Sequence, residues 1–348
     1  MGPALALCLT AMAAPPQSAP VRPAYFSIAT GATGSSYFPL GSLIATILSH
    51  PTGSVRCDIP SACGPEGLVA VAVASQGVVA NVRDVADGRV DSAFVPADVA
   101  SWAYNGTELF KSDPPHKALR AIARLYPEPI QIVISRGSGI KSLKGLKRRR
   151  VAGDSGDAAN SIETQRILSA AGLNKRSLRW IDATPAQAAA LMRKKKLDAF
   201  FYYGAAPSEV VGYLINDGVA DLLPLDGKEA KAVAATAPYL TPFVIPAGSY
   251  RDVGDTLTLA IGAVWVVRAS ASEDLVYQLT SALWDSSNRA LLQRSSAVAE
   301  SMSLEHALDG VAIPLHPGAA RFYLEKGMLG LKHADKEADA HPQPAKTR

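Results

Sequence analysis

Apolar and polar residues alternate in "AYFSIATG" (24–31), and this period of two predicts a strand. The following "SLIATIL" (42–48) has helical spacing, and residues 68–74 form a second apolar run of strand length. An amphipathic helix over 79–88 and a strand over 89–98 continue the same plan. The pattern therefore predicts alternating strands and helices, which is typical of α/β layers with mostly parallel sheets.

Two predicted strands are much longer than the others, "LRAIARLYPEPIQIVIS" (119–135) and "LTLAIGAVWVVRA" (257–269). In addition, "ADGRVDSAFV" (86–95) parallels "RKKKLDAFFY" (193–202), which suggests two lobes of similar construction. Long strands between similar lobes indicate a hinge. We therefore expect an α/β protein with two lobes and a ligand cleft between them, where strands end and helices begin.

The predicted lobes are residues 24–128 plus 263–330 for the first and 129–262 for the second. Residues 331–348 form a polar tail that we do not expect to fold. The start of the chain differs, because the apolar run 4–14 is followed by small residues and a Pro/Ser/Gln spacer. We interpret residues 1–20 as a secretory signal peptide, although no Lys or Arg precedes Arg22.

Composition and charge narrow the function classes. The chain has 348 residues, a formal net charge of +4, and no further apolar run of the 18 to 20 residues that a membrane span needs. Six of its cations lie in "KSLKGLKRRR" (141–150), which we interpret as a solvated turn before a strand. Basic stripes with interleaved aromatic residues, typical of nucleic-acid binding, are not visible. We predict an exported, periplasmic protein that does not itself span the membrane.

Cys57 and Cys63 remain once the signal peptide, which contains Cys8, is removed. A disulfide and a pair of zinc ligands are the two alternatives. A zinc site needs a second pair of ligands, and none follows in the sequence. An exported chain with a short loop between two cysteines favours the disulfide.

"VAGDSGDAANS" (151–161) contains Gly-Asp-Ser-Gly, which surrounds the nucleophilic serine of trypsin-like proteases. No histidine has a recognisable triad context, and Asp157 stands where the nucleophile elbow of α/β-hydrolases needs glycine. We therefore interpret the stretch as a loop that opens a helix, with Ser155, Gly156 and Asn160 placed to bind a ligand. A plain turn without a ligand is the alternative.

A second glycine turn, "TGATGSSYFPLG" (30–41), lies between the first strand and its helix. Ser35 and Ser36 stand at the expected N-cap, and the Tyr37 ring is placed to close over a ligand. The turn lacks the Gly-Lys-Ser/Thr of a P-loop and the Gly-x-Gly-x-x-Gly of dinucleotide sites, so we expect no nucleotide cofactor, nor any other. Thr30 and Gly34 complete the predicted loop.

"FSIATGATGSSYFPLGSLIATIL" resembles the opening of the TAXI-type receptors, the solute-binding subunits of tripartite ATP-independent periplasmic (TRAP) transporters. The similarity continues through "CGPEGLVAVA" and "LYPEPIQIVISRGSGIKSLKGLK" and covers roughly residues 25–325. It implies a type II periplasmic binding protein that has a TRAP permease as its partner. It also implies a solute such as glutamate, glutamine or a related dicarboxylate or oxoacid.

The chain departs from the family pattern at several polar positions. Asn81 and Asp98 match family residues, whereas Val78 and Pro96 replace a serine and a glutamine. In the second loop the family's Gly-Ser-Gly-Thr corresponds to the following residues: Asp157, Ala158, Ala159 and Asn160.

An Asp157 side chain that faces the cleft would oppose an anion and favour an amino group or a neutral solute. The alternative is that Asp157 only caps its own helix. Tyr202, with Tyr203 and Trp102, is a candidate aromatic residue of the cleft, although such residues more often belong to the core.

The sequence thus predicts a receptor for a small polar solute that acts by lobe closure, without covalent chemistry. An orphan receptor that feeds a sensor is the alternative within the binding class. A periplasmic hydrolase that uses Ser155 is the alternative from the enzyme class.

Overall fold

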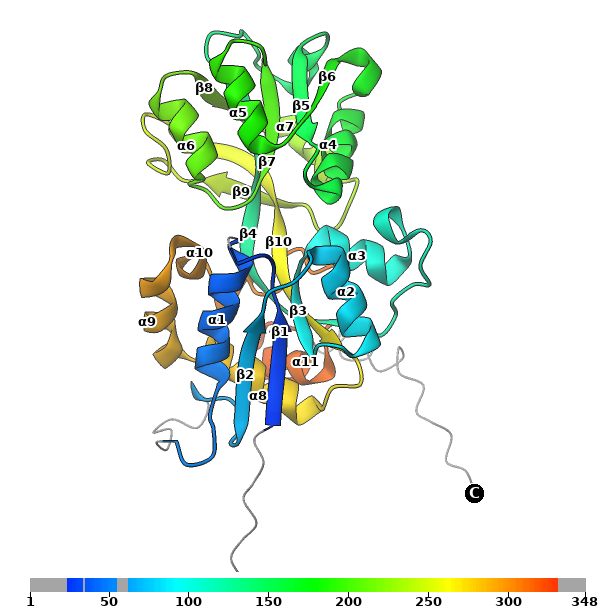
Figure 1. The fold of residues 1–348 in the computed structure, drawn as a ribbon, viewed down its shortest axis with the longest axis vertical. Helices are drawn as coiled ribbons and strands as arrows, with labels where there is room; N and C mark the ends of the chain where they lie inside the picture. Colours follow the sequence, from blue (N-terminus) through cyan, green and yellow to red (C-terminus); the bar gives the residue numbers. More distant parts are fainter. Residues whose placement is uncertain (1–23, 34, 55–61, 331–348) are drawn as a thin grey trace, which may run out of the picture.

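The computed structural model describes residues 24–33, 35–54 and 62–330, which form two lobes stacked along the long axis of the molecule (Figure 1). The signal peptide, the polar tail, Gly34 and Cys57 lie outside the described residues. The signal peptide and the Cys57–Cys63 disulfide therefore stay predictions. None of the helices in the described part of the chain is long and apolar enough to cross a bilayer.

The first lobe has three parallel strands at one side of its sheet and two further strands, β10 and β4, at the other. Alternating apolar residues place one face of β1 in the core, where Phe26 and Ile28 are buried. The strand order is β2-β1-β3-β10-β4. The elements are β1 (Ala24–Ala29), α1 (Tyr37–Leu48), β2 (Leu68–Val73), α2 (Val78–Asp87), β3 (Ser92–Pro96), α3 (Ala97–Asn105) and the 3-10 turn η2 (Glu108–Phe110).

The second lobe repeats this plan with strands in the order β8-β4-β7-β5-β6 and with β9 paired to β10. The strands are β5 (Arg150–Asp154), β6 (Arg179–Ala183), β7 (Ala199–Tyr203), β8 (Ala220–Leu223) and β9 (Thr241–Ile245). The helices are α4 (Ala158–Ala170), α5 (Pro185–Arg193), α6 (Glu209–Asn216) and α7 (Gly227–Ala234), with 3-10 turns η3 (Leu143–Leu146) and η4 (Lys175–Ser177).

Two antiparallel strands, β4 (Leu119–Ser135) and β10 (Thr256–Arg268), run through both lobes (Figure 1). Both read as nearly continuous apolar runs because both of their faces are covered. Their pairing changes register after Ala263 and again after Trp265, in the part of β10 that also pairs with β3 in the first lobe. The predicted lobe boundaries fall inside these two strands and stay a prediction.

After β10 the chain remains in the first lobe and covers its sheet with helices (Figure 1). Helix α11 packs on α8, and α8 also contacts α1. These elements are α8 (Glu273–Trp284), α9 (Ser286–Ser295), α10 (Ala297–Glu300), η5 (Leu304–His306) and α11 (Pro317–Glu325). The α/β fold with two lobes is as the sequence predicted.

Candidate functional site

The loop that opens α1 meets strand β4 through tyrosine hydroxyls. Ser36 is the N-cap residue of α1, but its side chain makes no capping bond. Instead its Oγ lies 3.0 Å from the Tyr126 hydroxyl, which donates to Glu128 Oε1 at 3.3 Å. The Tyr37 hydroxyl donates to Glu128 Oε2 at 3.5 Å, and the Tyr37 ring packs edge-on against Tyr126. Two phenols thus hold one carboxylate at the point where β4 leaves the first lobe.

The loop that opens α4 is held by its own acidic residues. Asp157 Oδ1 accepts hydrogen bonds from the backbone N–H groups of Ala159 (2.8 Å) and Asn160 (3.1 Å). Asp154 binds the Gly156 N–H at 2.9 Å and the Asn160 side chain at 3.1 Å. The interpretation of Asp157 as a helix cap is confirmed. Ser155, Gly156 and Ala158 are exposed in this loop.

The two loops lie close enough for their charges to interact. The Asp157 carboxylate, on the second lobe, raises the pKa of Tyr37, of Asp98 and of Glu128, all on the first lobe or its connecting strand. In each of these three groups burial is the larger cause of the rise. The pKa of Glu128 reaches about 7. We call Tyr37, Asp98, Tyr126, Glu128 and Asp157 the carboxylate–tyrosine cluster.

Other predicted site residues have polar groups that are used inside the first lobe. Thr30 is fully buried, and its Oγ1 donates to the Val73 carbonyl at 2.9 Å. Asn81 is also fully buried, and its Nδ2 donates to the carbonyls of Thr30 (2.6 Å) and Phe94 (2.9 Å). These bonds position the loop before α1. Ser35 Oγ is buried without a hydrogen-bond partner.

Tyr202 lies on β7 in the second lobe, opposite Gln131 of β4, and is half-buried. Its side chain packs against the core of the second lobe. It raises the pKa of Tyr126, although burial and Glu128 contribute more to that rise. Gly34, which the sequence also predicts to bind ligand, lies outside the described residues.

A second set of polar residues joins the lobes directly. Trp102 Nε1, on α3, donates to the Tyr239 hydroxyl at 3.2 Å, and that hydroxyl donates to Glu163 Oε1, on α4, at 2.7 Å. Arg166 Nε donates to the same oxygen at 3.1 Å, and Arg166 Nη2 lies 3.8 Å from Glu108 Oε1. We call Trp102, Glu108, Glu163, Arg166 and Tyr239 the Glu163 contact. Trp102, predicted as a candidate aromatic residue of the cleft, belongs to it.

Glu163 is completely buried, and its second oxygen, Oε2, has no hydrogen-bond partner. Among the charges that raise the pKa of Asp98, Glu163 has the largest effect after burial itself. Burial also raises the pKa of Glu163, whereas Tyr239 and Arg166 lower it. The Glu163 contact and the carboxylate–tyrosine cluster therefore adjoin each other through Asp98.

Sequence reasoning missed Tyr126, Glu128, Glu163 and Tyr239. One signal was present for Glu128, because it is the single acidic residue in the strand 119–135 and stands between two prolines. No comparable signal marked Glu163, which is one of two charged residues in α4. Its role depends on contacts with Tyr239, 76 positions away in the chain.

Two cavities border these groups. One of about 290 Å³ is lined by Tyr126 with Pro127 and Pro129 of β4, by residues 205–207 after β7, and by residues 296–298 around α10. Another of about 670 Å³ is lined by Glu108, Arg166 and neighbours on α4, beside the Glu163 contact. Among the described residues, no three side chains of His, Cys, Asp or Glu lie where they could hold a metal ion.

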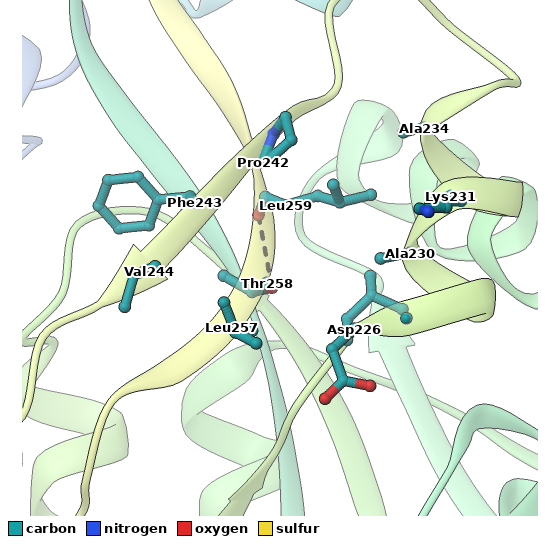
Figure 2. Close-up of a pocket in the computed structure, with 12 residues that line it drawn as sticks. Asp226, Ala230, Lys231, Ala234, Pro242, Phe243, Val244, Leu257, Thr258 and Leu259 are labelled. Atoms are coloured by element: carbon teal, nitrogen blue, oxygen red, sulfur yellow. Dashed lines mark hydrogen bonds between the residues drawn. The ribbon is translucent and has the colours of Figure 1, made fainter.

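A third cavity lies elsewhere, on the second lobe between α7 and the β9–β10 pair (Figure 2). It measures about 430 Å³ and its wall is mostly apolar, with Phe243, Val244, Leu257 and Leu259 among its residues. None of its lining residues belongs to the predicted site. Its place and its apolar wall make it a poor candidate for a small polar solute.

The described contacts give no support to a nucleophilic Ser155. Its backbone N–H donates to the Ala183 carbonyl at 3.2 Å, and within the described residues its hydroxyl forms no hydrogen bond with a histidine. The arrangement at α4 is that of a capped helix N-terminus.

Comparison with known proteins adds to this geometry. The model of the NMT1-like family matches residues 28–327. A periplasmic sulfonate-binding protein SsuA from Methylobacillus flagellatus KT has a similar structure, with a TM-score of 0.50, 15% identity, and coverage of 94% of this chain and 98% of that one. A TctC solute-binding protein from Polaromonas is also similar, with a TM-score of 0.50 and 16% identity. The match covers 92% of this chain and 98% of that one. At these identities the likeness shows the fold, which is that of periplasmic solute-binding proteins.

Proposed function

The chain belongs to the NMT1-like family, and we propose that it is the periplasmic solute-binding subunit of a TRAP-type transporter. The observation that carries the proposal is that two loops, one from each lobe, lie near each other beside β4 and β10, the strands that run through both lobes. Asp157 of the second lobe interacts with Tyr37 and Glu128 of the first. A small polar solute held there would contact both lobes at once.

Such a solute would stabilise the closed arrangement of the lobes. Because β4 and β10 are continuous through both lobes, they are the natural hinge. Ligand that binds only the closed form shifts the open–closed equilibrium toward closure. The closed receptor would then present the solute to a membrane permease. The TRAP-type permease as partner, and the TAXI-like character, rest on the sequence resemblance.

Solute binding and closure can be tested together. The purified protein would be screened by thermal shift with amino acids, dicarboxylates, oxoacids and amines at millimolar concentration. We expect at least one compound to raise Tm by several degrees, and the same compound to reduce the radius of gyration in small-angle X-ray scattering. A compound that raises Tm without changing the radius of gyration would contradict closure. Absence of any effect across the panel would contradict the receptor function.

A matched variant tests the hydrolase alternative. Ser155→Ala removes a hydroxyl from an exposed loop position that makes no described side-chain hydrogen bond. We expect it to leave any background hydrolysis of a broad ester and peptide panel unchanged. Loss of a measurable hydrolytic activity in Ser155→Ala would establish an enzyme instead.

A further inference from the structure

Among the described residues, no cation forms an ion pair with the carboxylates of Asp98, Glu128 and Asp157 at the lobe junction. The charged group that acts on Glu128 is another carboxylate, Asp157, and its hydrogen-bond donors are the two neutral phenols of Tyr126 and Tyr37. Asp98 is 2% exposed and has Glu163, Glu128 and Asp157 around it. Its described hydrogen bond comes from the Val99 backbone N–H at 2.7 Å. Buried carboxylates are normally paired, so this set is incomplete.

The guanidinium beside Glu163 is already engaged. Arg166 binds Glu163 Oε1 at 3.1 Å and pairs with Glu108 on its other side. Glu163 Oε2 nevertheless has no hydrogen-bond partner, although the side chain is completely buried and its charge acts on Asp98. The described residues therefore provide no N–H donor for this oxygen.

Aromatic rings border the same place. Tyr37 and Tyr126 lie edge to face at 6.2 Å between ring centroids. Tyrosine faces attract organic cations through the ring quadrupole, so carboxylates framed by phenols form a typical surround for an ammonium group. Glu128 keeps part of its surface accessible, which leaves room for contact with a solute.

We infer that the solute of this receptor carries a cationic group, an organic ammonium or amidinium, that binds Glu128 with Asp98 and Asp157 beside it. The inference rests on the proposed function and specifies its substrate class. It separates this chain from receptors for dicarboxylates, because a second carboxylate on the solute would meet like charges. An amino acid or a diamine without surplus negative charge fits the junction.

The inference also fixes a pH dependence. Burial raises the pKa of Glu128 to about 7, with Asp157 adding to the rise and the Tyr126 and Tyr37 hydroxyls opposing it. A cation binds the ionised form, so binding requires Glu128 to lose its proton. Affinity for an amine should therefore fall as pH drops below 7, by at most about tenfold per pH unit. A dicarboxylate would show the opposite trend.

The test compares two panels on the purified protein by thermal shift and isothermal titration calorimetry. The first contains putrescine, agmatine, L-lysine, L-arginine and choline, and the second L-glutamate, 2-oxoglutarate and succinate, with calcium chloride as a separate arm. We expect a member of the first panel to raise Tm and to bind more weakly at pH 6 than at pH 8. Glu128→Gln should weaken that binding at least tenfold, whereas Glu128→Asp should retain part of it.

Glu66→Gln is the matched control, because Glu66 is exposed and precedes β2 at the amino end of the sheet, away from the junction. It should leave affinity unchanged. If dicarboxylates or calcium bind and the amines do not, the cationic inference is overturned while the receptor function stands. If Glu128→Gln folds with an unchanged circular dichroism spectrum and binds the amine as tightly as the parent, the inference is likewise overturned. No binding in any arm overturns both.

Discussion

The lobes meet at two adjoining places, the Glu163 contact and the carboxylate–tyrosine cluster. Each contains a buried carboxylate, but the groups that stabilise that carboxylate differ. In the Glu163 contact the chain supplies its own cation, since Arg166 and the Tyr239 hydroxyl both donate to Glu163 Oε1. In the carboxylate–tyrosine cluster Glu128 receives only phenol hydroxyls, and the nearest charge is a further carboxylate. In the Glu163 contact, side chains of the protein itself hold the two lobes together. In the carboxylate–tyrosine cluster, the described side chains leave Glu128 without a cationic partner, which a bound solute would supply.

This difference separates structure from recognition. A contact that the chain completes by itself should matter mainly for stability and for the closed arrangement. A cluster that the chain leaves incomplete should cost stability when empty and gain it when occupied. The same lobe junction thus holds a part that can be tested by unfolding and a part that can be tested by titration.

The largest effect should come from breaking the Glu163 contact. Trp102→Ala removes a side chain that is 3% exposed, stacks edge-on against Tyr239 and donates to its hydroxyl. We expect a loss of about 3–5 kcal/mol in the free energy of unfolding, because the cavity cannot refill across the lobe boundary. Urea unfolding followed by circular dichroism measures it.

Trp102→Phe is the control, because it keeps most of the ring and deletes the N–H donor. It should cost less, on the order of 1 kcal/mol for the lost hydrogen bond plus a small packing loss. If Trp102→Ala lowered the free energy of unfolding no more than Trp102→Phe does, the indole would not be packed between the lobes. The Glu163 contact would then not contribute to stability.

The cluster should respond to pH in the opposite sense from an ordinary surface carboxylate. The pKa of Glu128 is about 7 in the folded protein, above the 4.5 of a free glutamate. A raised folded pKa contributes stability that is present below pH 4.5 and is lost as pH rises through 7. Glu128→Gln should therefore stabilise the ligand-free protein by about 1–3 kcal/mol at pH 8 and by little at pH 4.5.

The measurement is the urea midpoint of parent and variant between pH 4.5 and 8, without solute. Glu66→Gln, at an exposed position, should show no such slope. A Glu128→Gln protein that is less stable than the parent at pH 8 would mean that the carboxylate is satisfied within the chain. The cluster would then be the same kind of contact as that of Glu163.

Much of the fold was predictable because its signals are local. The strand expected over 119–135 matches β4 residue for residue. The loop expected over 151–161 opens a helix as predicted, and that helix, α4, begins at Ala158 because the Asp157 side chain caps it.

The site was only partly predictable because its partners are distant in the chain. The sequence pointed to Tyr37 and Asp157 through the loops that open their helices. It gave no reason to bring Glu128 to Tyr37, 91 positions away, or Trp102 to Tyr239, 137 positions away. Thr30 and Asn81 were predicted to bind a ligand. The Thr30 hydroxyl and the Asn81 Nδ2 donate to backbone carbonyls, whereas Asn81 Oδ1 is buried without a hydrogen-bond partner. Polar residue types mark a loop, but only packing decides which groups remain unpaired.

The smallest predicted effect separates the two uses of Asp157, as cap and as charge. Asp157→Asn keeps an oxygen for the Ala159 and Asn160 N–H groups, whereas Asp157→Ala removes it and should cost about 1 kcal/mol of folding stability. If the charge contributes to the cluster, both variants should weaken amine binding alike, by about threefold, since Asp157 acts on Glu128 through space. Calorimetry with the amine that binds, beside urea unfolding of both variants, gives the two numbers. Weakened binding in Asp157→Ala but not in Asp157→Asn would assign Asp157 to the loop alone, and the cationic group would then lie against Glu128 and Asp98 without it.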